Sequence, residues 1–184
     1  MVEGTGVRRA DAVRNRDALL AAGREVFRTA GAGASVEDVA KRAGVGKGTL
    51  YRHFPTKDHL IAAILQAHFD DLVAEAERLR AHPDPLVAVE TWLRDFDRGP
   101  AHFPGLRERM AAVFADETSE IARACEPMKA SFAELFDRAR AAGAVHDDVD
   151  SRQLLTLVAA LPHAGRGADD ASPMLDIVLR GIAR

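Results

Sequence analysis

One short stretch of the sequence, residues 47–54, combines basic and aromatic side chains at helical spacing. Leu50 and Phe54 are four residues apart and predict the buried face of a helix, so the side chains between them point outward. Lys47 would place a positive charge at the positive end of that helix, and Gly48 in its first turn would weaken it by up to ~1 kcal/mol relative to alanine. Both features are understandable if an anionic backbone, such as that of DNA, approaches here.

The element that must position this helix is a second helix just before it. Its apolar residues lie on one predicted face: Val36, Val39, Ala40 and Ala43. Ser35 is of a type that caps helix starts, and Gly44 can adopt the left-handed conformation that ends a helix. Because only residues 44–46 separate the two helices, the sequence predicts a helix-turn-helix.

The region from Leu19 to Leu60 resembles the DNA-binding motif of the TetR family of bacterial transcriptional repressors. The matching residues are Leu19, Leu20, Ala21, Ala22, Val26, Phe27, Ala43–Val45, Lys47–Phe54, Thr56–Asp58 and Leu60. One departure is Gly46, where the family commonly has serine. A glycine cap is weaker than serine by only a few tenths of a kcal/mol, so the fold is kept but one possible phosphate contact is lost.

The resemblance implies a role for each residue of the motif that would lie near DNA. Ser35, Lys47, Tyr51, His53 and Lys57 would touch phosphates, and Gly48, Thr49 and Arg52 would approach base edges. The planar fork of arginine suits guanine, and a threonine methyl suits the methyl group of thymine. The alternative for Tyr51 and His53 is an ordinary half-buried aromatic pair.

Helical periodicity continues to the end of the chain without strand-like alternation, which predicts an all-α protein. We expect a DNA-binding domain over residues 1–57 and a helical regulatory domain, for ligand binding and dimerisation, over residues 58–184. The regulatory helices are expected at 58–81, from Pro85, at 106–115, at 119–142 with a kink or break at Pro127, after Asp150, and from Pro173.

Apolar residues surround most of the last helix and therefore require burial. A partner subunit is the natural place, and the resemblance implies dimers held by the last two helices. The residues expected at this homodimer interface are Leu154, Leu157, Val158, Leu161, Leu175, Val178, Leu179 and Ile182.

Aromatic and methionine side chains are concentrated in the middle helices, where the resemblance implies a pocket for an unknown small-molecule effector. The expected ligand-binding residues are His68, Phe69, Trp92, Phe96, Met110, Phe114, Met128 and Phe132. A plain helical core is the alternative for this cluster, and a satisfied core histidine is the alternative for His68.

Charge is divided unevenly along the chain. Residues 1–58 carry 11 Lys+Arg and 7 Asp+Glu, a net +4, and the remainder carries 14 against 21, a net −7, which together give the total of −3. DNA contact is therefore expected only at the N-terminal end. Arg8, Arg9, Arg14 and Arg16 suggest a basic N-terminal arm, either reaching the minor groove or forming a solvated tail.

The remaining patterns argue against an enzyme. Sequence fingerprints of hydrolases, zinc proteases and nucleotide-binding proteins are absent, so no catalytic residue, cofactor or metal is expected. The cluster His146–Asp150 is explained as a turn and helix cap, and the single cysteine, Cys125, as a packing residue in preference to a redox sensor.

We expect a cytoplasmic protein associated with the nucleoid through double-stranded operator DNA, without a membrane span. Two other interpretations remain open at this point. One is a helical protein-interaction module that does not bind DNA, and the other is a TetR-like activator without a small-molecule ligand.

Overall fold

The computed structural model describes residues 3–98, 118–162 and 173–184. The helices in these ranges are α1 (Glu3–Ala30), α2 (Val36–Ala43), α3 (Lys47–His53), α4 (Lys57–Leu79), α5 (Pro85–Arg98), α7 (Glu120–Ala124), α8 (Glu126–Ala141), α9 (Ser151–Ala159) and α10 (Pro173–Ile182), with a short 3-10 helix η1 (Gly31–Gly33). Within these ranges, strand-like pairing is limited to one bridge between Val145 and Ala183. The all-α prediction is therefore confirmed. The helix expected at 106–115 lies outside the described residues.

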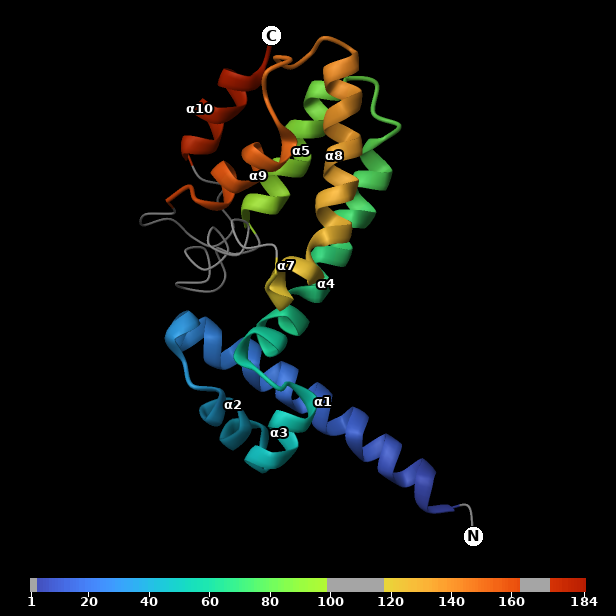
Figure 1. Ribbon diagram of the computed structural model, residues 1–184, viewed down its shortest axis with the longest axis vertical. Coiled ribbons are helices and arrows are strands. Elements are labelled where there is room, and N and C mark those ends of the chain that lie inside the picture. The colour runs from blue at the N-terminus through green and yellow to red at the C-terminus, as the bar shows by residue number, and fades with distance from the viewer. Residues whose placement is uncertain (1–2, 99–117, 163–172) are drawn as a thin grey trace.

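The helices form an elongated molecule with two ends (Figure 1). At one end, α2 and α3 lie against α1, and at the other end α9 and α10 lie beside α5. The long helix α4 runs from the first group into the second, where α8 packs against both α4 and α5. No helix among the described residues is long and apolar enough to cross a membrane.

Most helix boundaries follow from capping residues in the sequence. Thr56 caps α4 by accepting a hydrogen bond from the backbone N–H of His59 at 3.3 Å. Asp84 caps α5 through the N–H of Leu86 at 2.9 Å, and Asp150 caps α9 through the N–H of Gln153 at 2.9 Å. The turn-and-cap explanation of residues 146–150 is thus confirmed.

Pro127 divides the segment at 119–142 into two helices. Cys125 lies between α7 and α8, and Pro127 occupies the first turn of α8, where the missing N–H of proline costs nothing. The Cys125 side chain is fully buried, and burial raises the pKa of its thiol. Both facts support the packing role expected for this residue.

The N-terminal segment differs from the expected arm. It is the beginning of α1, which starts at Glu3 and continues without interruption to Ala30. Alanine and arginine favour helix, and Arg14 forms an ion pair one turn back with Asp11. The Arg16 guanidinium lies 5.7 Å from the centroid of the Phe54 ring, which ties α1 to the end of α3.

Helix α1 of the N-terminal group crosses and contacts α4, the helix that continues into the second group. Gly23 lies at this crossing, and a Cβ atom on it would be 2.7 Å from the Cδ1 atom of Ile64. A side chain at position 23 would therefore require the Ile64 side chain to shift. The absence of a Cβ allows α1 to lie directly on α4.

Candidate nucleic-acid interface

The turn between α2 and α3 is built by local backbone chemistry. Ser35 accepts a hydrogen bond from the N–H of Glu37 at 3.1 Å and so caps α2. Gly44 adopts φ +69° at the end of α2, and the N–H of Val45 donates to the Ala40 carbonyl at 3.1 Å. The helix-turn-helix predicted from the sequence is therefore present.

One face of α3 is anchored and the other faces solvent. Leu50 and Phe54 are buried, whereas Lys47, Gly48, Tyr51 and Arg52 are exposed, and Thr49 and His53 are half-buried. The residues expected to contact DNA on this helix thus share one accessible surface.

Among the described residues nothing requires a glycine at position 48. Apart from its sequence neighbours and the backbone of its own helix, a Cβ atom here would meet no described atom within 4 Å, and its φ is not positive. The close approach that a glycine permits is therefore available to a molecule outside the chain, as expected of a residue facing DNA.

Tyr51 and His53 do not form the aromatic pair considered as an alternative. The Tyr51 hydroxyl donates a hydrogen bond to Oε1 of Glu37 at 2.9 Å, and the side chain is exposed. His53 instead lies beside Phe54, with ring centroids 6.3 Å apart.

Glu37 is a member of this surface that the sequence analysis missed, because the helical pattern only places it facing water. Its Oε2 atom accepts a hydrogen bond from the Ser35 hydroxyl at 2.5 Å, and its Oε1 atom lies 3.8 Å from Nζ of Lys47. The hydrogen bonds from Ser35 and Tyr51 lower the pKa of the Glu37 carboxyl to about 2. The carboxylate is thus charged at neutral pH.

Lys57 has an additional role inside the chain. Its Nζ donates to the Ala34 carbonyl at 2.7 Å and lies 5.6 Å from the centroid of the Phe27 ring. These contacts join the start of α4 to the last turn of α1 and to Ala34, the residue that follows η1. A phosphate contact from Lys57 remains a prediction.

The aromatic residues expected to bind a ligand pack mainly against one another. The Trp92 ring stacks on Phe132 at 4.5 Å and on Phe96 at 5.5 Å between centroids, and its Nε1 donates to the Leu72 carbonyl at 2.9 Å. Phe69 and Met128 are also buried. The structure brings these side chains together as a buried cluster, while Met110 and Phe114 lie outside the described residues.

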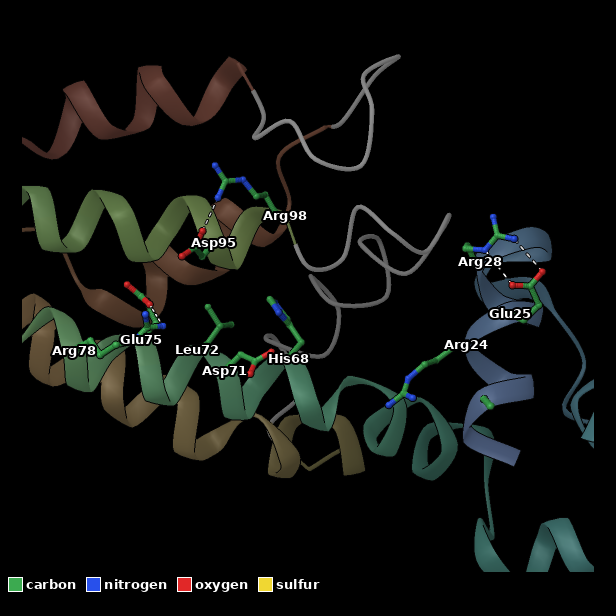
Figure 2. A pocket seen from close by; sticks show the side chains of 11 residues that line it. Arg24, Glu25, Arg28, His68, Asp71, Leu72, Glu75, Arg78, Asp95 and Arg98 are labelled. Atoms are coloured by element: carbon green, nitrogen blue, oxygen red, sulfur yellow. Dashed lines mark hydrogen bonds and ion pairs between the residues drawn. The ribbon is translucent and has the colours of Figure 1, made fainter. Parts of the chain in front are cut away.

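A cavity of about 630 Å³ lies beside this cluster, between α1, α4 and α5 (Figure 2). Leu72 and Ala21 supply apolar surface, and His68 is the member of the expected ligand set that lines it among the described residues. Among the described residues, three ion pairs lie at its border: Arg28 with Glu25, Arg78 with Glu75, and Arg98 with Asp95. Such a border suits an amphipathic molecule better than a purely apolar one.

Most of the residues expected at the dimer interface pack inside a single chain, and their place in a dimer remains a prediction. Six of them are buried within the chain itself: Leu154, Val158, Leu161, Leu175, Leu179 and Ile182. Val178 is half-buried, and Leu157 is 50% exposed. The inward face of α10 uses the positions 175, 179 and 182 for the protomer's own core.

Exposed apolar side chains do occur on the same two helices. Met174 is 48% exposed and Ile177 63% exposed on α10, and they accompany Leu157 of α9. The sequence could not separate these residues from the buried set, because α10 is apolar around most of its circumference.

Two family models match the chain. The model described as bacterial regulatory proteins of the tetR family matches residues 19–64. The model described as the C-terminal domain of SbtR-like transcriptional regulators matches residues 84–184, which is more than half of the chain.

The chain is also similar to individual transcriptional regulators. The transcriptional repressor KstR of Mycobacterium tuberculosis is 32% identical over 152 residues, which cover 77% of this chain and 68% of KstR. The transcriptional activator FasR of Mycolicibacterium smegmatis is 47% identical over 60 residues, or 32% of this chain and 27% of FasR. The crystal structure of the TetR regulator SCO0520 from Streptomyces coelicolor, 31% identical, matches 91% of this chain and 98% of its own with a TM-score of 0.55.

Proposed function

Since this chain belongs to the TetR family of bacterial transcriptional regulators, we propose that it binds an inverted-repeat operator as a homodimer and releases it when a small molecule binds. The main support for DNA binding is the solvent-facing side of α3. Lys47, Tyr51 and Arg52 are exposed on a helix that the chain anchors only from its other side. A helix held in this way can enter a major groove. The protein would act in the cytoplasm, at the nucleoid.

Repression is the proposed direction of regulation. KstR, named a repressor, is similar over more than two thirds of both chains, whereas the similarity to FasR, named an activator, covers 27% of FasR. A bound dimer would then keep polymerase from a promoter until the effector arrives.

The apolar residues exposed on α9 and α10 support a homodimer. Leu157, Met174 and Ile177 lie on helices at the end of the molecule away from α3 (Figure 1). Pairing two copies through this end leaves both recognition helices free. One short helix contacts few base pairs, so two half-sites are needed for specific binding.

The proposed effector site is the cavity between α1, α4 and α5. A molecule there would touch His68 and Leu72 of α4 and Arg24 of α1 at once. A ligand that prefers one arrangement of these helices shifts the population away from the arrangement that spans both half-sites. A ligand inserted deeper would have to separate the stacked rings of Trp92, Phe96 and Phe132.

Selection of bound duplexes from random DNA tests the DNA-binding part of this proposal. We expect enrichment of an inverted repeat whose affinity falls steeply with salt. Amphipathic compounds are then screened for loss of operator binding, with a typical coupling of about 1–3 kcal/mol, or roughly 5- to 150-fold. The emission of Trp92, the only tryptophan, reports binding beside Leu72. Selection without an enriched repeat would refute operator binding.

A further inference from the structure

We propose that Glu37 is a built-in competitor of DNA phosphate, which holds three donors of the recognition surface in the DNA-free protein and must release them on binding. This inference rests on the proposed DNA-binding function. It concerns a residue outside the set expected to contact DNA, and it assigns to that residue control over how tightly the protein binds any duplex.

The geometry gathers donors from two helices around one carboxylate. The hydroxyl of Ser35 reaches Oε2 of Glu37 at 2.5 Å, and the hydroxyl of Tyr51 reaches Oε1 at 2.9 Å. The ammonium of Lys47 lies 3.8 Å from Oε1. A carboxylate and a phosphate both offer anionic oxygen acceptors, so Glu37 occupies the position of an anion among exposed donors.

Hydrogen counting makes the contacts mutually exclusive. Tyr51 and Ser35 each have a single hydroxyl hydrogen, and each directs it to Glu37. The acceptor side of Ser35 is also engaged, by the backbone N–H of Glu37. Neither hydroxyl can donate to a phosphate until its bond to Glu37 is broken.

Competition of this kind lowers the affinity of the protein for every DNA sequence by a similar factor. Phosphate contacts position a protein on the duplex without distinguishing base pairs. A side chain that competes for phosphate donors therefore reduces affinity for operator and for random DNA by a similar factor. Base discrimination by Arg52 and Thr49 is left intact, because the side chains that Glu37 contacts are those of Ser35, Tyr51 and Lys47.

Glu37→Gln tests the proposal, since glutamine keeps the shape and removes the charge. We expect roughly fivefold to twentyfold tighter binding to operator and random duplexes, measured by fluorescence anisotropy. The log–log salt dependence should steepen by roughly 1 as Lys47 becomes free for a phosphate. In a Tyr51→Phe background the gain should shrink, because one of the contested hydrogens is gone.

Two further variants distinguish competition by Glu37 from the effect of removing any negative charge near the DNA-binding surface. Asp38→Asn removes an equal charge from the adjacent exposed position of α2 and should change affinity less than Glu37→Gln. Glu37→Asp keeps the charge and the helix start but shortens the reach to Tyr51, so it too should tighten binding. Equal gains from Asp38→Asn and Glu37→Gln would overturn the proposal.

Tyr51 is the only tyrosine, so its absorbance titration reports the contact directly. The hydrogen bond to Glu37 raises the pKa of Tyr51, and Glu37→Gln should return that pKa toward its ordinary value. A Glu37→Gln protein that binds DNA as weakly as the unaltered chain, or more weakly, would overturn the competitor role while leaving the proposed function standing. Failure of the unaltered chain to bind any DNA would overturn both.

Discussion

Arg52 is the exposed side chain of α3 best suited to distinguish base pairs. A guanidinium donates two parallel hydrogen bonds to the O6 and N7 atoms of guanine, which a lysine ammonium or a hydroxyl cannot do. Arg52 forms no ion pair with another residue of the described part of the chain, whereas the Arg42 guanidinium on α2 lies 3.8 Å from the Glu25 carboxylate. Arg42 carries the same charge as Arg52 but lies on α2, so it is a suitable control for Arg52.

We predict that Arg52→Ala relaxes sequence preference. The variant should lose about 1–3 kcal/mol of discrimination at one base pair of each half-site, because the bidentate contact is specific to guanine. Arg42→Ala, the matched control, should change the affinity for operator and random DNA by the same small factor. Competition binding with single-base operator variants measures both effects. Equal losses from Arg52→Ala on operator and random duplexes would remove Arg52 from the base-contacting set.

Residue-level prediction succeeded where the signal is local. Ser35, Gly44 and the outward residues of α3 follow from capping preferences and helical spacing within a few residues. The bond between Glu37 and Tyr51 joins residues 14 apart and depends on how α2 and α3 cross. Sequence periodicity gives the face of each helix but not the angle between two helices, so this contact could not be predicted.

The crossing of α1 and α4 is the element-level feature that links the DNA-binding helices to the rest of the chain. A Cβ atom on Gly23 of α1 would lie 2.7 Å from the Cδ1 atom of Ile64 of α4, so the Ile64 side chain would have to move. Helical alanine is more stable than glycine by up to ~1 kcal/mol, so propensity alone would favour alanine here. Close packing of the two helices opposes that preference.

A double-mutant cycle at this crossing should show strong coupling. Gly23→Ala should lower the free energy of unfolding by about 1 kcal/mol, because overpacking costs more than the gain in helix propensity. Ile64→Val deletes the clashing Cδ1 atom, so the double variant should recover about 1 kcal/mol relative to the sum of the single changes, measured by urea denaturation.

Gly48→Ala is the matched control for the change at Gly23. Beyond its own helix backbone and sequence neighbours, no atom of the described residues lies within 4 Å of a Cβ at position 48, so this variant should not lose stability. Additive effects of Gly23→Ala and Ile64→Val, within about 0.3 kcal/mol, would show that the two helices do not press on each other at this point.

Several helix boundaries after residue 35 were predictable to within a few residues, whereas the start of α1 and the packing between helices were not. The helix expected at 58–81 is α4 (Lys57–Leu79), and the break at Pro127 falls where the proline rule requires it. In contrast, the apolar residues of α10 could not be sorted into a core face and an exposed face. That division depends on where α5, α9 and the segment at Val145, between α8 and α9, lie around α10, which the local sequence does not encode.

At the scale of the whole molecule, the exposed residues of α9 and α10 define the surface for pairing two copies. We predict that Ile177→Glu, at a position 63% exposed, gives a folded monomer with much weaker operator binding. Val87→Glu, at a 40% exposed position of α5, should remain dimeric and serves as the control. Light scattering gives the mass and circular dichroism the helix content.

Leu179→Ala should behave differently, because Leu179 is buried in its own chain. Loss of a core leucine costs about 2–5 kcal/mol of stability, so this variant should unfold at lower temperature whatever its oligomeric state. An Ile177→Glu protein that stays dimeric would exclude the exposed side of α10 from the interface.

The lengthwise separation of the two ends also has a kinetic consequence. The helices that would meet DNA lie at the basic end, and the acidic remainder of the chain extends away from them (Figure 1). The molecule therefore carries an electric dipole along its long axis. In the field of a polyanion this dipole turns the basic end forward before contact, so a larger share of collisions is productive. Added salt should then slow association itself, because screening removes the orienting torque.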